Sequence, residues 1–382
     1  MSGAARWLAA AAALALLPAT LAAQADSTPP RPPSHWSLDL PVRGYGLSFG
    51  NSARFTGLRF NLRDAGLERV DGINVTLWTP GKPVSGSVTG LAVGLVGPAA
   101  AELDGIAAGL VGVVAERRAR GLMVGGVGVV SRGGLDGIGL AGAGLVSQGR
   151  LRGVDLAGLG VVAEGGMTGI GAAGLGVVSQ GPMVGLQVAG LGTIAQGDMT
   201  GLFASGLATV SAGALDGITA SGLATVAQGD LTGAHAAGLA VVTQGDVRGL
   251  AAAGLATVAQ GRIRGLALGG LAVVGEEQIR GIAAGGLAVV SEGGIRGLSV
   301  AGYEIRSPRV AGIAVAGIRL KAGAMSGLSL SAFNQVRGVQ VGVSIGLINY
   351  ARELHGLQIG VVNIARNNGA PFKVLPILNA HF

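Results

Sequence analysis

The chain lacks cysteine and has few aromatic or charged residues. Without cysteine among its 382 residues it can form no disulfide, no thiolate metal site and no cysteine-borne lipid anchor. Aromatic residues make up 3% and charged residues 12% of the chain. The net charge of +7 comes from scattered lysines and arginines without interleaved aromatics, so we expect no nucleic-acid partner. Because the chain can form neither a disulfide nor a thiolate metal site, its stability must come from packing.

Long uninterrupted apolar runs are also missing. Past the amino terminus, no stretch of ~18 apolar residues lacks interrupting glycines, so we expect no membrane-spanning helix. The apolar run Leu8–Leu17 follows Arg6 and precedes Ala23–Ala25, which is the pattern of an export signal and its cleavage site. We therefore predict a signal peptide over residues 1–25. The four prolines of residues 26–35 then predict an extended linker.

Glycine, in contrast, is abundant and regularly spaced. The chain has 73 glycines, and from Gly105 a glycine opens each of twelve successive units of sixteen residues. Numbering each unit from this glycine, its recurrences are Gly121, Gly137, Gly153, Gly169, Gly185, Gly201, Gly217, Gly233, Gly249, Gly265, Gly281 and Gly297. A period kept without insertion indicates an array whose neighbouring units must stay in register.

Large apolar residues recur within each unit at positions two, seven, ten and fifteen. From Gly153, nine successive units carry glycine at position six and leucine at position seven. The resulting spacings of five and three do not match the three-and-four alternation of an amphipathic helix, and each interior glycine would cost a helix about 1 kcal/mol. We therefore predict strands, with all four large apolar residues buried between units.

Charged residues occupy a narrow part of each unit. Between Gly105 and Arg296 there are 22 of them, and 21 lie at positions twelve to sixteen, the exception being Asp155. Each unit is thus about eleven uncharged residues followed by a polar turn such as Gln228–Asp230. We expect the polar turns to line a solvent edge and the residues between them to avoid water.

Two all-β architectures fit this unit. The favoured one is a β-solenoid-like stack in which each unit is one coil of two strands, each of roughly six residues. The alternative is a closed β-barrel of outer-membrane type, in which each unit supplies one long membrane-crossing strand, or a variant in which short hairpins pack radially into a shallow barrel. The barrel is disfavoured because Phe203 is the sole aromatic residue of the array, so aromatic girdles are missing. The terminal Phe382 resembles an outer-membrane assembly signal and supports the barrel, although Pro376 interrupts the preceding alternation.

The array has flanks of different composition. Alternating apolar and polar residues predict strands over Phe55–Leu62 and Gly72–Trp78, within a β cap spanning residues 36–104. The array itself covers residues 105–297. Residues 298–382 form a carboxy-terminal β region in which the strict period is lost and amides and aromatics return.

The end of this last region resembles a known family. Its segments GLQIGVVNIA and PFKVLPILNAHF, within Gly356–Phe382, are similar to the glycine-rich surface-repeat proteins of bacterial envelopes. The resemblance implies export and a non-enzymatic envelope role, and it supplies no catalytic residue. The array departs from the family by carrying alanine, valine or threonine where glutamine and asparagine would stand, which leaves any family binding surface unassigned.

Several motifs could carry chemistry, but each has a plainer explanation. Two G-x-G-x-x-G matches, the motif of a dinucleotide site, fall at repeat phase without a following helix. Threonine at position nine would form a ladder of hydroxyls, but β-propensity explains it. Aspartate recurs in the turns too sparsely for a calcium-binding roll, so we interpret it as a turn residue in water. The four histidines share no ligand spacing, and we interpret His235 as an outward-facing variant of the repeat. The residues concerned are Gly137, Gly139 and Gly142, Gly169, Gly171 and Gly174, Thr193, Thr209, Thr225 and Thr257, Asp198, Asp216, Asp230 and Asp246, and His35, His355 and His381.

We accordingly predict no catalytic, cofactor-binding or metal-binding residue. The expected function is that of an exported, non-enzymatic cell-envelope repeat protein, a structural or adhesive scaffold located at the outer membrane or cell surface. Its expected partners are envelope components, lipid, or further copies of itself bound through apolar faces, with no small-molecule substrate. The alternative is a pore-like outer-membrane β-barrel.

Overall fold

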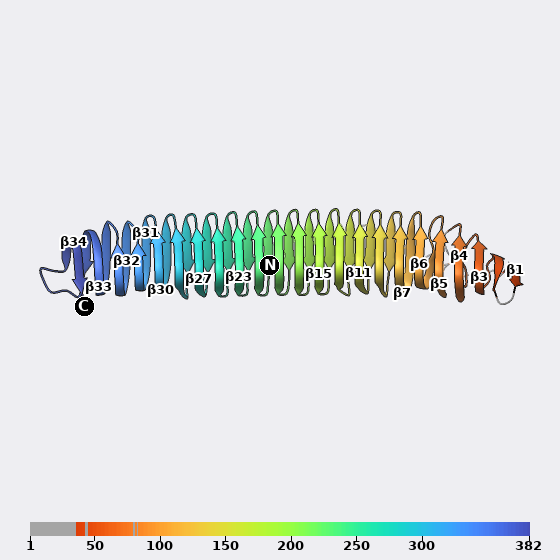
Figure 1. Ribbon diagram of the computed structural model, residues 1–382, viewed down its shortest axis with the longest axis horizontal. Helices are drawn as coiled ribbons and strands as arrows, with labels where there is room; N and C mark the ends of the chain where they lie inside the picture. Colours follow the sequence, from red (N-terminus) through yellow and green to blue (C-terminus); the bar gives the residue numbers. More distant parts are fainter. Residues whose placement is uncertain (1–35, 43–44, 79–80, 82) are drawn as a thin grey trace, which may run out of the picture. The chain divides into compact units, whose positions relative to one another are not determined.

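The computed structural model describes residues 36–42, 45–78, 81 and 83–382, and these form an all-β solenoid of about 19 turns (Figure 1). No helix occurs among these residues. The predicted signal peptide and linker lie outside them. The predicted all-β repeat fold and its solenoid form are therefore confirmed.

The strands fall into four groups. The amino-terminal strands are β1 (Ser37–Val42), β2 (Tyr45–Gly50), β3 (Arg54–Asn61), β4 (Arg69–Thr76), β5 (Ser87–Gly94), β6 (Ala99–Gly109) and β7 (Gly112–Gly125). The carboxy-terminal strands are β30 (Glu304–Ala316), β31 (Arg319–Leu330), β32 (Phe333–Ile345), β33 (Ile348–Ala365) and β34 (Val374–His381).

Between them the array alternates long and short strands. The long strands are β9 (Gly134–Ala141), β11 (Arg150–Ala157), β13 (Met167–Ala173), β15 (Met183–Ala189), β17 (Met199–Ser205), β19 (Leu215–Ser221), β21 (Leu231–Ala237), β23 (Val247–Ala253), β25 (Ile263–Gly269), β27 (Gln278–Gly285) and β29 (Gly294–Ala301). The short strands are β8 (Gly128–Ser131), β10 (Gly144–Ser147), β12 (Gly160–Ala163), β14 (Gly176–Ser179), β16 (Gly192–Ala195), β18 (Ala208–Ser211), β20 (Ala224–Ala227), β22 (Ala240–Thr243), β24 (Ala256–Ala259), β26 (Ala272–Gly275) and β28 (Ala288–Ser291).

Each coil pairs with the coil before it and the coil after it, never with itself. The long strand β19 is parallel to β17 and β21, and the short strand β20 is parallel to β18 and β22. Every residue thus faces its counterpart sixteen residues away, as in the pair Leu215 and Leu231. The closed-barrel alternative is wrong in both forms, because the two strands of a unit pair in parallel with neighbouring coils and therefore form neither one strand of a wall nor a hairpin.

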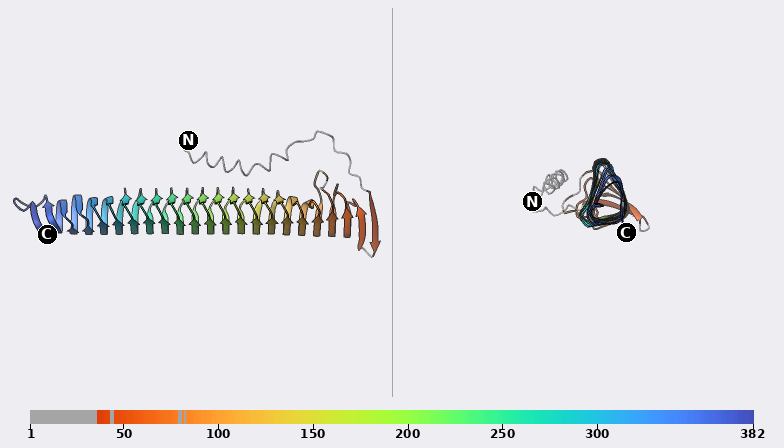
Figure 2. Two further views of the ribbon diagram at one scale, coloured as in Figure 1. Left: turned by 90° about the horizontal axis from the view of Figure 1, so that it is seen from above. Right: turned by 90° about the vertical axis from the view of Figure 1, so that its left-hand side faces the viewer.

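The predicted strand lengths were also wrong in detail. Instead of two strands of about six residues, the coil has a long strand of seven, such as β19, and a short one of four, such as β20. The long strand runs through the opening glycine, Gly217, which has a φ of +125°. Viewed end on, the coils are triangular (Figure 2).

The opening glycine cannot be replaced without strain. Besides its positive φ, a Cβ added at Gly217 would lie 2.0 Å from the carbonyl oxygen of Gly201 in the preceding coil. At position six, a Cβ on Gly222 would lie 1.9 Å from the carbonyl oxygen of Gly206. These two glycines of each unit therefore permit the backbones of successive coils to approach closely.

The core is built from odd-numbered positions. Positions fifteen, three, five, nine and eleven are buried through the array, as the alternation of side chains along a strand requires. Position fifteen supplies the largest of them, a row of side chains at most 2% exposed. This row comprises Leu135, Leu151, Met167, Met183, Met199, Leu215, Leu231, Val247, Ile263, Ile279 and Ile295.

The expected burial of four large apolar residues per unit is therefore wrong for three of them. Positions two and ten are even-numbered and point outward, and position seven lies in the turn between the two strands. The leucines at position seven are all exposed, and the valine or isoleucine at position ten is half-buried except for Val130, which is exposed. Only position fifteen contributes a large buried side chain in every unit from Gly121 onward, the first unit having Ala119 there, and small residues fill most of the remaining interior.

The regions flanking the array continue the same stack. Gly57, Gly72, Gly90 and Gly105 pair in register, so the predicted β cap consists of coils of unequal length. Its two predicted strands correspond to β3 and β4. After the array, β30 to β33 continue as further parallel strands up to β34, which is antiparallel.

Both outermost strands reverse direction and carry a proline. At one end β1 is antiparallel to β2 and includes Pro41, and at the other β34 is antiparallel to β33 and includes Pro376. Proline donates no backbone hydrogen bond, and an antiparallel edge does not match the parallel edge of another coil. Such ends oppose uncontrolled end-to-end stacking of separate molecules.

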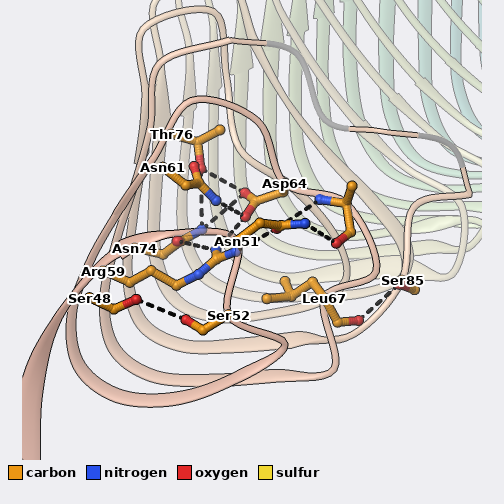
Figure 3. A network of polar contacts seen from close by, with 11 residues as sticks. Ser48, Asn51, Ser52, Arg59, Asn61, Asp64, Leu67, Asn74, Thr76 and Ser85 are labelled. Atoms are coloured by element: carbon orange, nitrogen blue, oxygen red, sulfur yellow. Dashed lines mark hydrogen bonds and ion pairs between the residues drawn. The ribbon is translucent and has the colours of Figure 1, made fainter. Parts of the chain in front are cut away.

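The end coils hold polar side chains where the middle holds apolar ones. Near the amino terminus, the fully buried Arg59 forms an ion pair with Asp64 and donates a 2.8 Å hydrogen bond to Asn74 (Figure 3). Asp64 also accepts a 2.6 Å hydrogen bond from Thr76. A charged pair this deeply buried depends on such additional partners, because neither ion retains its water.

A buried amide ladder plays the corresponding part at the other end. The side-chain amide of Asn334 donates to Asn349 over 2.8 Å, and that of Asn349 donates to Asn363 over 2.7 Å. Each amide thus bonds its counterpart in the next coil. The ladder fixes the register of coils whose lengths vary.

We expect Gly217→Ala to destabilise the solenoid by about 1–3 kcal/mol through backbone strain, before any cost of the clash with Gly201 is counted. Gly144→Ala is the matched control, because a Cβ there would lie 3.8 Å from the nearest atom and the backbone has no positive φ. Urea unfolding followed by circular dichroism measures both. Equal stability of the two variants would contradict this role of the opening glycine.

Candidate functional site

The most distinctive surface is an apolar face running along the array. We define it by positions two, four and seven of each unit. The nine leucines at position seven, from Leu159 to Leu287, are between 43% and 54% exposed. At position two, exposed aliphatic side chains include Ile170, Leu202 and Ile218. Two parallel rows of large aliphatic side chains therefore lie in water in the isolated chain.

A shallow groove separates the two rows. Its floor is made by positions four to six, which are mostly alanine, serine and glycine, and it forms hollows of about 500 Å³ and 610 Å³ along the array. A further hollow of about 620 Å³ continues over the carboxy-terminal coils, where Leu330, Ile345 and Ile359 contribute to its walls. The apolar face is thus ridged lengthwise, with the same profile repeated from coil to coil.

Charge is confined to the part of the coil predicted from the sequence. The turn residues at position twelve are exposed from Arg132 onward, and so are most charged side chains at position sixteen of the array, including Asp216 and Arg264, while Asp136 is half-buried. The predicted solvent edge is confirmed, but the expectation that all other positions avoid water is wrong, because the apolar face lies between them.

The turn aspartates have a structural partner that the sequence analysis missed. The carboxylate of Asp198 accepts a 2.8 Å hydrogen bond from the backbone N–H of Ala214. In the same way Asp230 accepts from Asp246, and Asp246 accepts from Arg262, each over 2.8 Å. Asp at position fourteen therefore secures the turn of the next coil, and its recurrence at that position was the available signal.

The one charged residue outside the turns, Asp155, points into the solenoid. It is 2% exposed at position three, and its neighbours in the adjacent coils, Gly139 and Gly171, leave room for its side chain. Its Oδ1 has no hydrogen-bond partner among the described residues. Burial raises the pKa of Asp155 to about 7, because the ionised form loses its water without gaining a partner.

His235 also lies inside, so its interpretation as an outward-facing variant is wrong. It occupies position three and is fully buried, with Nδ1 3.0 Å from the hydroxyl of Thr219. Burial lowers the pKa of His235, which favours the neutral ring. Position three is odd-numbered, and this parity was the signal that could have placed it correctly.

The threonines at position nine are interior as well. Thr193, Thr209, Thr225 and Thr257 are fully buried, so they present no hydroxyl array to solvent. Two of them join a hydrogen-bonded chain with serines of neighbouring positions, in which Ser221 donates to Thr209 over 2.9 Å. The hydroxyls of this chain satisfy one another, whereas Thr257 donates to the carbonyl of Leu268 over 2.7 Å and Oγ1 of Thr193 has no hydrogen-bond partner among the described residues.

The remaining motifs do not assemble into a recognised site. The G-x-G-x-x-G matches lie across β9 and β13 and the turns that follow them, with no helix among the described residues to receive a phosphate. The rings of His355 and His381 come within 5.9 Å of each other, although they are far apart in sequence, and Nε2 of His355 lies 3.0 Å from Glu353. Within the described residues no group of three or more histidine, aspartate or glutamate side chains is arranged to hold a metal ion.

The described part of the chain contains no helix with the length and hydropathy that a membrane span requires.

The shifted carboxyl of Asp155 predicts a pH dependence. The folded chain keeps this group protonated up to about pH 7, whereas in the unfolded chain it ionises near 3.8, so unfolding releases a proton between these values. Stability therefore falls as the pH rises through this range, by roughly 4 kcal/mol if the whole shift is realised. We expect Asp155→Asn to remove this loss.

Urea unfolding at about pH 5 and about pH 8 measures the effect, since these values bracket most of the transition. Asp216→Asn, an exposed aspartate of the same array, is the control and should keep the pH dependence of the parent chain. A parent chain that is as stable at the higher pH as at the lower one would show that Asp155 does not titrate as described.

Comparisons with protein-family models, with curated proteins and with solved structures each found no match to this chain.

Proposed function

We propose that this protein is an exported, non-enzymatic scaffold of the cell envelope that holds its apolar face against an envelope partner. The observation that carries the proposal is the pair of exposed aliphatic rows on either side of a groove, repeated without interruption by charge. A soluble monomer rarely exposes apolar patches beyond ~300–600 Å² unless they bind something.

The size of the face supports this proposal. The twelve units of the array at ~4.8 Å each extend over ~58 Å, and the five steps from position two to position seven span ~16 Å. An apolar face of roughly 900 Å² follows from these dimensions, which exceeds the usual patch and reaches the area of one side of a stable interface.

The distribution of titratable groups favours a scaffold over an enzyme. Asp155 and His235, the two buried groups with shifted pKa values, are five coils apart, or ~24 Å at the usual strand spacing. Both point into the solenoid and away from the groove. A general acid and base must reach the same substrate atoms, which this placement prevents.

We expect the fourfold variant Leu175→Ser, Leu207→Ser, Leu239→Ser and Leu271→Ser to lose retention in the envelope fraction of expressing cells. Each leucine is about half exposed, and covering it stabilises the bound state by on the order of 1 kcal/mol. Because these contributions are roughly additive, the variant should bind its envelope partner at least tenfold more weakly. Stability should change little, because the side chains are not in the core.

The matched control replaces four exposed glutamines of the polar turns, Gln180→Ser, Gln196→Ser, Gln228→Ser and Gln244→Ser. Quantitative blotting of soluble and envelope fractions, with circular dichroism of the purified chains, separates binding from folding. If the leucine variant fractionates like the glutamine variant while both fold, the apolar face does not hold an envelope partner.

A further inference from the structure

A row of four arginines borders the apolar face in the carboxy-terminal part of the array. Arg248, Arg264, Arg280 and Arg296 occupy position sixteen of successive units, and β23, β25, β27 and β29 pair them in register. All four side chains are exposed. Adjacent strands are ~4.8 Å apart, so four like charges stand closer together than an uncompensated surface favours.

The chain compensates this arginine row only in part. Arg248 pairs with Asp230 at 3.0 Å and with Asp246 at 3.3 Å, and Nε of Arg280 donates to the amide oxygen of Gln278 over 2.6 Å. Within the described residues, Arg264 and Arg296 form no ion pair within 4 Å, although Arg264 is close enough to Asp246 to help lower the pKa of that carboxyl. The nearby acids Glu276, Glu277 and Glu292 lie at positions twelve and thirteen, on the other side of the turn.

Charge is also segregated along the solenoid axis. Residues 153–247 contain six acidic residues and no lysine or arginine, whereas residues 248–352 contain eleven basic and four acidic residues, a net charge of +7. The same apolar rows therefore run past an acidic middle and then past a basic segment. Only in the basic segment does a row of cations lie beside the apolar face.

A hollow of about 300 Å³ lies at the end of the arginine row. Arg296 and Arg309 contribute to its lining together with Gln278 and the backbone of Gly294. Two guanidinium groups and an amide at one hollow form a donor set suited to a phosphate group.

We infer that the basic segment, residues 248–352, docks sideways on a surface of anionic lipid. The aliphatic rows enter the boundary between headgroups and acyl chains, and the arginine row contacts the lipid phosphates. Only the opening glycine separates position sixteen from position two in the chain, so cation and aliphatic side chain can engage the two layers of the same surface. The inference rests on the proposed function and names the partner class of its apolar face.

A second copy of the chain fits the same surface less well. A parallel, in-register copy would bring one arginine row against another. An antiparallel copy would need acids bordering its own apolar face, but of the six acids in residues 153–247 only Asp216 is at position sixteen. The solenoid body is also straight (Figure 1), so its rows present a line that a flat lipid surface can cover throughout.

Co-sedimentation of the full chain with vesicles tests the inference. The probes are vesicles of phosphatidylcholine alone and vesicles in which part of it is replaced with phosphatidylglycerol. We expect binding to the anionic vesicles that weakens as salt is added, and at least tenfold weaker binding to the neutral ones. Equal binding to both would overturn the role of the arginine row.

An arginine variant and a charge-matched control locate the contact. Arg264→Gln, Arg280→Gln and Arg296→Gln together should lower the affinity roughly a hundredfold, at about fivefold per arginine near an anionic surface. The charge-matched control Arg117→Gln, Arg132→Gln and Arg150→Gln changes positions twelve to fourteen and should lower it severalfold at most. Similar losses in both would show attraction by net charge only and overturn the proposed contact.

The apolar contribution is tested in the same assay. Leu255→Ser, Leu271→Ser and Leu287→Ser should weaken binding at least tenfold, and Leu191→Ser, Leu207→Ser and Leu223→Ser, in the acidic middle, should weaken it much less. Sedimentation equilibrium of each chain reports whether copies associate instead. If the chain forms a stable dimer and binds to neither type of vesicle, the lipid assignment is overturned. If retention in the envelope fraction still depends on the leucines in that case, the proposed function stands.

Discussion

The close parallel contact between the backbones of successive coils governs the whole structure. Leu223 donates its N–H to the carbonyl of Leu207 over 2.8 Å, and Leu239 repeats this bond to Leu223. Such contacts leave no space for a Cβ at positions one and six of most units, which explains the abundance of glycine. They also forbid insertions within a coil, because one extra residue would turn every following side chain of that strand to the opposite face.

The sequence was enough to predict the fold, but not which side chains face inward. The period of sixteen, the glycines and the confined charges were sufficient for an all-β stack with a polar edge. The prediction that all large apolar residues are buried is wrong for Leu223 and Ile218. Within the strands, alternation assigns the interior to odd positions whatever the size of the residue, so alanines and threonines at these positions are buried and Ile218, at position two, is exposed. Leu223, at position seven, is exposed for another reason, because it lies in the turn between the two strands.

Size as the sign of burial also explains why the sequence does not predict the candidate surface. It assigns both aliphatic rows to the core, although position two is even-numbered and position seven lies in a turn. The prediction for His235 is wrong in the opposite sense, because its polarity indicates a place in water whereas its side chain is fully buried. Parity cannot predict whether the interior has room for a single polar side chain. Asp155 fits because its neighbours in the two adjacent coils are glycines.

A narrow interior filled mostly by small side chains provides limited hydrophobic stabilisation per coil, so the ends of the stack are the places where it would otherwise fray. Polar networks around Arg59 and along Asn334, Asn349 and Asn363 occupy these places. Directional hydrogen bonds specify register more strictly than apolar contacts do, although they contribute less net stability. The middle of the solenoid can then stay uniform, and a uniform middle keeps the exposed rows straight. The surface on which the proposed function depends is in this sense a product of the same coil-to-coil register that holds the interior together.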